Sequence, residues 1–260
     1  MQFLDRDGLR LAYDDLRPQG EPAGVVVLVH GFATNRDENW RRLGWLAAFE
    51  RKNWHVIAFD LRGHGQSDKP HDPAFYGRDE MAGDIIALMD HLNLSRVDLM
   101  GYSMGAHLSL AAALASPDRF ANLILGGIGK RRSQEETQTK MTMAEAMRAQ
   151  DASAISDATL RGFRQFAENQ GEDRLALAAC SESAGTPIRL ENLRTLAVPT
   201  LVVTGDLDEI AGDPHAVSDA IPGAKCVSLP GCDHFTAIPH ALFKAAVFDF
   251  LEGWLDDELP

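Results

Sequence analysis

Residues 97–115 read VDLMGYSMGAHLSLAAALA, and this stretch decides the fold. Val97–Tyr102 is a short apolar run typical of a buried strand, and Met104–Ala115 is rich in leucine and small residues, as expected of a helix. Glycines two positions before and after Ser103 allow the strand to turn abruptly into the helix. Such a turn projects the Ser103 hydroxyl at the carboxyl end of the sheet, where sites in α/β proteins gather. We therefore predict that Ser103 is a catalytic nucleophile rather than an ordinary turn serine.

Short β-rich runs alternate with helical stretches on both sides of this segment. The pattern predicts a mostly parallel sheet covered by helices, which is an α/β fold. The expected strands are Gln2–Asp5, Leu9–Tyr13, Val25–Val29, Val56–Asp60, Val97–Tyr102, Leu123–Gly126, Thr200–Thr204 and Ala224–Leu229. The expected helices are Trp40–Arg51, Tyr76–Leu92, Met104–Ala115, Pro214–Ala220 and His240–Leu255.

The pattern changes between residues 130 and 186, where no strand is predicted and the chain is polar, helical and rich in methionine. We interpret this segment as a helical insertion that divides the α/β core into residues 1–129 and 187–260. The basic run Lys130-Arg131-Arg132 opens the insertion. We favour a solvated helix face for this run over a site for acidic substrates.

A second motif, Val29-His30-Gly31-Phe32, ends a predicted strand and enters a loop. The backbone N–H groups of Phe32 and Met104 are the predicted donors to the negative charge that develops on a carbonyl oxygen during nucleophilic attack. We expect His30 itself to hold the loop.

The third motif, residues 60–68 (DLRGHGQSD), shapes a tight loop beside the site. Asp60 and Arg62 are expected to brace this loop. For His64 we favour a structural role over a place in the pocket wall.

A serine nucleophile needs a base, and the base needs a carboxylate that fixes its tautomer. Asp206 and Asp208 both follow the Thr200–Thr204 strand. We favour Asp208 because it lies further into the loop, whereas Asp206 is placed to make turn hydrogen bonds. His234, in the run Gly231-Cys232-Asp233-His234-Phe235 before the last helix, is the predicted base. Cys232 is expected to be a packed small residue.

Together these motifs resemble the α/β-hydrolase superfamily, in particular the lid-bearing bacterial serine hydrolases that include esterases and enol-lactonases. The chain order Ser103, Asp208, His234 is the order of that family. The resemblance implies an eight-stranded, mostly parallel sheet with a small helical cap inserted after the sixth strand. It also implies that Ser103 is the nucleophile, Asp208 the acid and His234 the base, with Phe32 and Met104 as the oxyanion donors.

Departures from subfamily patterns narrow the expected chemistry. Epoxide hydrolases and haloalkane dehalogenases have Asp where this chain has Ser103, so a carboxylate nucleophile is disfavoured. Carbon–carbon bond hydrolases usually have Ser-x-Gly-Gly, whereas this chain reads Ser-Met-Gly-Ala at 103–106. Cofactor-free haloperoxidases tend to have Trp at the position of Phe32.

These departures favour hydrolysis of a small-molecule carboxylic ester through an acyl-enzyme, without a metal or an organic cofactor. Hydrolysis of a lactone or of a carbon–carbon bond in aromatic-compound breakdown is the alternative, and a ligand-binding protein on the same scaffold is the non-enzymatic one. The substrate-binding residues are left unassigned. The insertion's methionines, with Phe163 or Phe166, would form either an apolar acyl pocket or the core of the cap, and we favour the core.

The composition limits which binding partners and which cellular compartment are expected. The chain has 260 residues and a formal net charge of −13, a field that repels nucleic acid and anionic membranes. Three widely spaced cysteines form no disulfide framework, and the charged N-terminus lacks the apolar region of a signal peptide. We therefore expect a cytoplasmic enzyme with small-molecule partners, while the oligomeric state stays open.

Overall fold

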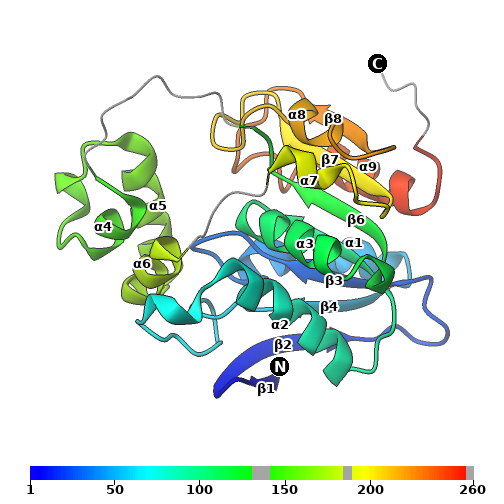
Figure 1. Ribbon diagram of the computed structural model, residues 1–260, viewed down its shortest axis with the longest axis horizontal. Coiled ribbons are helices and arrows are strands. Elements are labelled where there is room, and N and C mark those ends of the chain that lie inside the picture. Colours follow the sequence, from blue (N-terminus) through cyan, green and yellow to red (C-terminus); the bar gives the residue numbers. More distant parts are fainter. Residues whose placement is uncertain (131–140, 184–188, 256–260) are drawn as a thin grey trace.

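In the computed structural model, which describes residues 1–130, 141–183 and 189–255, one eight-stranded sheet runs through the core (Figure 1). Its strand order is β1-β2-β4-β3-β5-β6-β7-β8. The first two strands pair antiparallel, β2 pairs antiparallel with β4, and the remaining pairs are parallel. The predicted fold class is therefore confirmed. The strands are β1 (Gln2–Arg6), β2 (Leu9–Leu16), β3 (Val25–Val29), β4 (His55–Phe59), β5 (Val97–Tyr102), β6 (Phe120–Gly126), β7 (Thr200–Gly205) and β8 (Lys225–Leu229).

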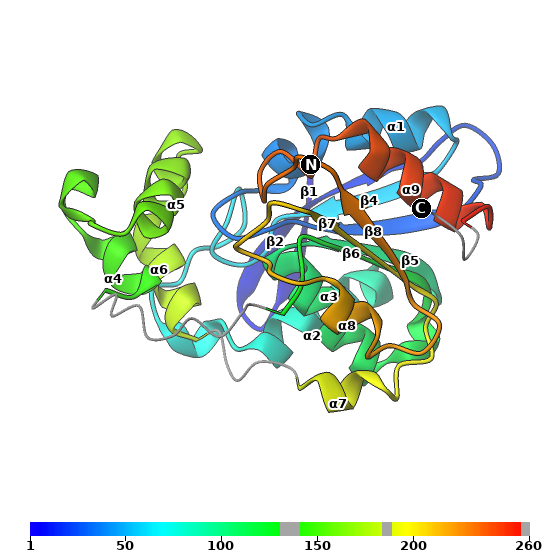
Figure 2. The ribbon, with the colours of Figure 1, turned by 90° about the horizontal axis from the view of Figure 1, so that it is seen from above.

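Helices cover both faces of the sheet, as Figure 2 shows, with α1 and α9 on one face and α2, α3 and α8 on the other. Successive side chains of β3 point to opposite faces, so Val26 and Leu28 join one core cluster and Val27 and Val29 join the other. Burial on both faces explains why this strand is a continuous apolar run. The helices outside the cap are α1 (Trp45–Arg51), α2 (Arg78–His91), α3 (Met104–Ala115), α7 (Leu190–Leu193), α8 (His215–Ser218) and α9 (Ala241–Leu251).

The helix expected at Trp40–Arg51 is interrupted, and this part of the prediction was wrong. A π-helical turn spans Asp37–Arg41, and α1 begins only at Trp45. Gly44 between them has a φ of 76°, a left-handed conformation that a regular helix cannot contain. Trp40 and Trp45 are both fully buried, so the apolar pattern continues across the break.

Among the described residues between β6 and β7, three helices lie within the predicted insertion, here called the cap: α4 (Met143–Arg148), α5 (Ala158–Asn169) and α6 (Arg174–Glu182). Figure 1 shows them set apart from the sheet at one end of the molecule. The predicted cap limits, 130 and 186, adjoin or fall within segments outside the described residues, so the domain limits stay a prediction. Met147 and Phe163 belong to the buried cluster that holds the cap helices together, which supports the core interpretation.

Glu172, in the turn between α5 and α6, links the cap to the core. Its carboxylate accepts hydrogen bonds from Asn35 Nδ2 at 2.8 Å and from the backbone N–H of Gly65 at 2.9 Å. Burial raises the pKa of this carboxyl above its ordinary value. His71 contacts the neighbouring Asp173 at 2.9 Å. The cap therefore rests on the two loops that also border the candidate site.

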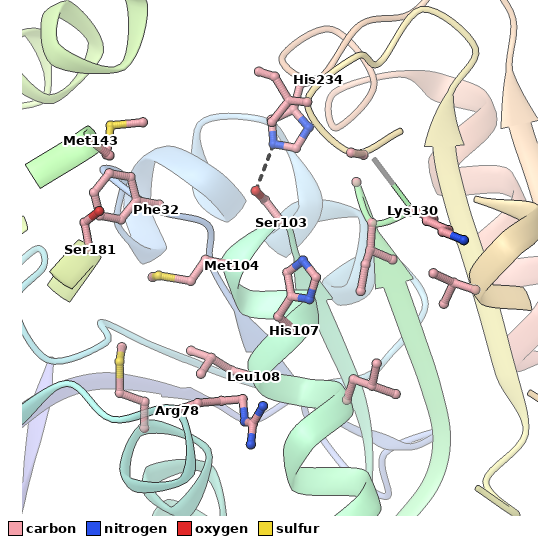
Figure 3. Close-up of a pocket in the computed structure, with 18 of the residues that line it drawn as sticks. Phe32, Arg78, Ser103, Met104, His107, Leu108, Lys130, Met143, Ser181 and His234 are labelled. Atoms are coloured by element: carbon pink, nitrogen blue, oxygen red, sulfur yellow. Dashed lines mark hydrogen bonds between the residues drawn. The ribbon is translucent and has the colours of Figure 1, made fainter. Parts of the chain in front are cut away.

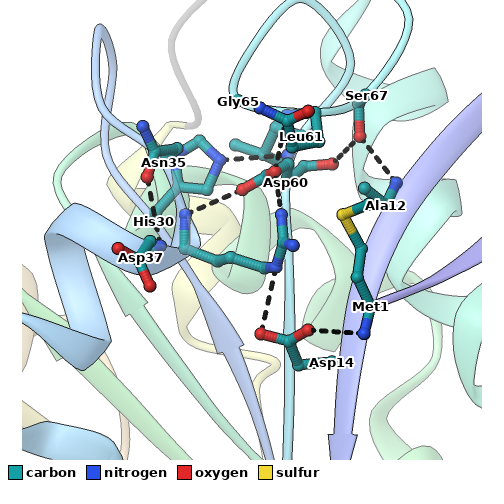
Figure 4. A network of polar contacts seen from close by, with 12 residues as sticks. Met1, Ala12, Asp14, His30, Asn35, Asp37, Asp60, Leu61, Gly65 and Ser67 are labelled. Atoms are coloured by element: carbon teal, nitrogen blue, oxygen red, sulfur yellow. Dashed lines mark hydrogen bonds and ion pairs between the residues drawn. The ribbon is translucent and has the colours of Figure 1, made fainter.

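A buried polar network holds these loops in place (Figure 4). Asp60 accepts hydrogen bonds from the backbone N–H groups of Arg36, at 2.8 Å, and Gln66, at 2.7 Å, and it pairs with the Arg36 guanidinium. The Arg62 guanidinium pairs with the buried Asp84 at 2.6 Å. The predicted bracing roles of Asp60 and Arg62 are thus confirmed.

His30 is fully buried and fastens the second motif to the third. Its Nδ1 lies 2.7 Å from the carbonyl of Gly31, and its Nε2 accepts the backbone N–H of Leu61 at 3.0 Å. Burial holds the pKa of His30 well below its ordinary value, so the ring is neutral. His64 is also fully buried, with its ring centroid 5.2 Å from that of His30. Both histidines have the structural role expected of them.

Candidate active site

Ser103 lies on the tight turn between β5 and α3. Its backbone has φ 54° and ψ −117°, a strained conformation for a residue with a side chain. The turn passes very close to its neighbours: a Cβ on Gly101 would lie 2.3 Å from the carbonyl oxygen of Gly105, and one on Gly105 would lie 2.1 Å from that of Val29. Glycine is therefore required at both positions of the motif.

Substituting Gly105 by alanine is expected to destabilise the protein by about 3 kcal/mol, because the new methyl group would overlap backbone atoms that cannot move aside. For a chain of this size that corresponds to a fall in Tm of roughly 6–12 °C. Gly162→Ala is the matched control, since Gly162 lies in α5 with no atom within 4 Å of an added Cβ. Thermal unfolding followed by circular dichroism measures both variants, and equal Tm values would contradict the packing argument.

The structure brings Ser103, His234 and Asp208 together. Figure 3 shows the contact between Ser103 and His234. Ser103 Oγ lies 2.8 Å from His234 Nε2, and His234 Nδ1 lies 2.7 Å from Asp208 Oδ2. A carboxylate can only accept, so His234 carries its proton on Nδ1 and presents Nε2 as an acceptor for the serine hydroxyl. This arrangement can withdraw the hydroxyl proton as the oxygen attacks.

The loop after β7 distinguishes the two candidate aspartates. Asp208 is buried, and its Oδ1 accepts the backbone N–H groups of Ile210 at 3.1 Å and Ala211 at 2.8 Å, which leaves Oδ2 for His234. Asp206 is exposed and accepts the backbone N–H of Gly231 at 2.7 Å. Asp206 thus braces the turn that carries His234 but does not contact its ring.

Tyr102 also positions His234, and the sequence analysis missed it. Its hydroxyl donates to the backbone carbonyl of His234 at 2.6 Å. Burial raises the pKa of Tyr102 well above its ordinary value, so the hydroxyl keeps its proton and remains a donor. The position before the serine carried no signal for this contact, because the two residues are 132 positions apart.

Phe32 and Met104, the predicted oxyanion donors, line the same cavity as Ser103. Met104 is the first residue of α3, so its backbone N–H has no partner within the helix. The partial positive charge of the helix N-terminus adds to this donor. Their role in binding an oxyanion stays a prediction.

A cavity of about 720 Å³ opens beside Ser103, and both the core and the cap line it. Its walls are mostly apolar. Figure 3 shows Leu108 and Met104 from α3 together with Met143 from α4. Phe163 lines it as well, so this cap residue belongs to both the cap core and the pocket wall. The polar side chains on its wall include Arg78, His107, Lys130 and Ser181.

A second, smaller pocket of about 190 Å³ also reaches Ser103. It shares four residues with the large cavity, and its further polar lining comes from the 31–39 loop region and from the cap. Sequence reasoning missed these residues, because nothing in their local pattern indicates that they lie near the serine. The shared residues are Phe32, Ser103, Phe163 and His234, and the further polar ones are Thr34, Glu38, Asn39 and Gln170.

Cys232 is buried, as expected of a packed small residue.

Among residues 1–130, 141–183 and 189–255, no group of three His, Cys, Asp or Glu side chains could hold a metal ion. No helix in the described part of the chain is long and apolar enough to span a bilayer. In the basic run, Lys130 is exposed, and residues 131 and 132 lie outside the described residues.

The sequence is similar to those of known proteins. The chain is 31% identical over 235 residues to the dihydrolipoyllysine-residue acetyltransferase component of an acetoin cleaving system from Pseudomonas putida, covering 85% of this chain and 61% of that protein. It is 26% identical over 269 residues to a putative 2-succinyl-6-hydroxy-2,4-cyclohexadiene-1-carboxylate synthase from Bacillus subtilis, covering 94% and 96% of the two chains.

The fold is shared with solved structures. The enol-lactonase from Burkholderia xenovorans LB400 superposes with a TM-score of 0.78 at 24% identity, over 96% of this chain and 100% of that one. Residues 24–191 match the family model described as alpha/beta hydrolase fold. The chain therefore belongs to the alpha/beta hydrolase fold family.

Proposed function

We propose that this protein is a serine hydrolase that cleaves a carboxylic ester of a small molecule through an acyl-enzyme. The observation that carries the proposal is the hydrogen-bonded chain from Ser103 through His234 to Asp208, at 2.8 Å and 2.7 Å, beside a largely apolar cavity. A cavity of this size and lining suits the apolar part of a small ester.

In the proposed first half-reaction, His234 Nε2 takes the proton of Ser103 as Oγ attacks the ester carbonyl carbon. The carbonyl oxygen becomes an oxyanion that accepts hydrogen bonds from the backbone N–H groups of Phe32 and Met104. The tetrahedral intermediate collapses, its carbon–oxygen bond to the alcohol breaks, and the departing oxygen takes the proton from His234. Asp208 stabilises the imidazolium throughout and stays ionised.

In the second half-reaction, His234 takes a proton from a water molecule, and the water oxygen attacks the acyl carbon. Collapse of the second tetrahedral intermediate releases the carboxylic acid, and His234 returns its proton to Ser103 Oγ. Each step uses side chains and backbone groups of this chain and water.

Hydrolysis of a lactone or of a carbon–carbon bond is the second candidate. A polar cap residue facing the nucleophile would favour it, and Ser181 of α6 and Gln170 at the end of α5 line the two pockets. A lactone is a cyclic ester, so the same attack and the same oxyanion site would serve it.

The predicted cytoplasmic location, and the absence of nucleic-acid and membrane partners, stay predictions.

A substrate panel tests the proposal on the wild-type protein. We expect turnover of p-nitrophenyl butyrate to exceed turnover of an enol-lactone and of a meta-cleavage dienoate, and a fluorophosphonate to add one phosphonyl group per chain by intact mass. Faster turnover of the lactone or the dienoate would favour the second candidate. A protein that neither labels nor turns over any of the three would be a ligand-binding protein on this scaffold.

A further inference from the structure

The side-chain amide of Asn39 is buried in the small pocket beside Ser103. Asn39 lies in the π-helical turn Asp37–Arg41 and is only 6% exposed. Its Oδ1 accepts the backbone N–H of Gly31 at 3.3 Å. This contact fixes the orientation of the Asn39 amide. The backbone N–H of Gly31 needs an acceptor, so the Oδ1 atom of Asn39 faces it and the Nδ2 atom does not. The two N–H bonds of Nδ2 are thus directed elsewhere.

Nδ2 of Asn39 has no hydrogen-bond partner within the described part of the chain. A buried donor that lacks a partner bears the cost of leaving water without any return. Asn39 lines the small pocket, although almost none of the surface of Nδ2 itself is open, so a bound molecule would have to displace neighbouring side chains slightly to reach it. The amide is therefore a candidate binding group at the wall of this pocket.

The two pockets meet at the candidate nucleophile, since both include Ser103 and His234. An ester whose carbonyl carbon lies at Ser103 Oγ would place its acyl part in one pocket and its alcohol part in the other. The larger side of such an ester fits the apolar cavity of about 720 Å³, and the smaller side fits the 190 Å³ pocket that contains Asn39.

The charge in the small pocket limits the acceptor that Asn39 can meet. Glu38 lines the same pocket and pairs with Arg42 at 3.0 Å. A carboxylate on the substrate would be repelled by the Glu38 carboxylate, whereas a neutral oxygen would not. A carbonyl, ether or hydroxyl oxygen is therefore the acceptor that fits.

We propose that Asn39 is a substrate-binding residue whose Nδ2 donates a hydrogen bond to a neutral oxygen on the smaller side of the ester. This inference rests on the proposed function, because the position of the ester relative to Asn39 follows from attack by Ser103. It narrows the substrate class to small esters with an additional neutral oxygen close to the scissile carbonyl.

Three esters of equal length test the inference: butyl butyrate, butyl methoxyacetate and 2-methoxyethyl butyrate. The second has an ether oxygen on the acyl side, and the third has one on the alcohol side. For each analogue, kcat/KM is divided by that for butyl butyrate, so that changes common to all three esters cancel. We expect Asn39→Asp to lower one of these two ratios by about 10-fold relative to wild type.

Asn39→Asp retains the size of the side chain and an oxygen for Gly31 N–H, but it replaces the donor by an acceptor. Asn169→Asp is the matched control, because it makes the same amide-to-acid change on an exposed side chain that lines neither pocket. We expect it to leave both ratios within about twofold of wild type. An equal effect of Asn169→Asp would assign the change to charge alone and overturn the inference.

The outcomes also separate the inference from the proposed function. A wild-type protein that hydrolyses none of the three esters would contradict the proposed function. A protein that hydrolyses them, with both ratios unchanged in Asn39→Asp, would overturn the role of Asn39 and leave the proposed function standing. Asn39→Ala removes the amide altogether, so it must lower the same kcat/KM ratio as Asn39→Asp. If Asn39→Asp does not fold, Asn39→Ala takes its place in the experiment.

Discussion

Replacing Ser103 by alanine is expected to lower kcat for ester hydrolysis by about 10⁶-fold, because the proposed acyl-enzyme cannot form without the nucleophilic oxygen. Steady-state kinetics on p-nitrophenyl butyrate measures the loss, and labelling with a fluorophosphonate should disappear with it. The Tm should stay close to that of wild type, since alanine removes one oxygen from a half-buried side chain.

Ser109→Ala is the matched control for this experiment. Ser109 is a buried serine of α3, the helix that follows Ser103, and its hydroxyl makes no hydrogen bond within the described residues. Its removal should change kcat by no more than about twofold, in line with the small effects of substitutions that break no contact. If Ser103→Ala folds and retains activity comparable to Ser109→Ala, Ser103 is not the nucleophile.

Asp208→Asn is expected to lower kcat by about 10⁴-fold with little change in structure. An asparagine can turn its amide N–H toward His234 Nδ1, which moves the ring proton to Nε2. That nitrogen then cannot accept the proton of Ser103, and the imidazolium loses the negative charge that stabilises it. The measurement is kcat for p-nitrophenyl butyrate across the pH range in which the wild type is active.

Asp206→Asn separates the two aspartates of this loop. An asparagine at 206 still offers an oxygen to the backbone N–H of Gly231, so the turn before His234 should persist and kcat should fall by less than about 10-fold. If Asp206→Asn and Asp208→Asn lower kcat by similar factors, catalysis depends on the conformation of this loop and not specifically on the Asp208 carboxylate.

The strands of the core were predictable because their pattern is local. Val25–Val29 was placed at its observed limits, because a strand buried on both faces must be apolar throughout. The break at Gly44 was not predicted, since Trp40 and Trp45 keep the apolar spacing while the backbone changes direction. Short elements such as α7 (Leu190–Leu193) have too few residues to show a period.

The candidate site, like the fold, has features that the local sequence predicted and features that needed the structure. The glycine-flanked Ser103 and the loops of Asp208 and His234 each follow a strand, so their chain order predicted that parallel strands would bring them to one edge of the sheet. The hydrogen bonds themselves connect residues 131 and 26 positions apart, and the structure was needed to measure them. The roles of Phe32 and Met104 remain predictions.

The sequence alone determined the fold class and the type of chemistry to test, because a tight strand-to-helix turn needs glycine at 101 and 105 and thereby marks Ser103. Only the tertiary structure decided what surrounds that serine. The large cavity is assembled from core and cap residues, and the small pocket contains Asn39 next to Glu38. These neighbours come from separate parts of the chain, and burial of a polar group such as the Asn39 amide depends on packing that no local pattern records.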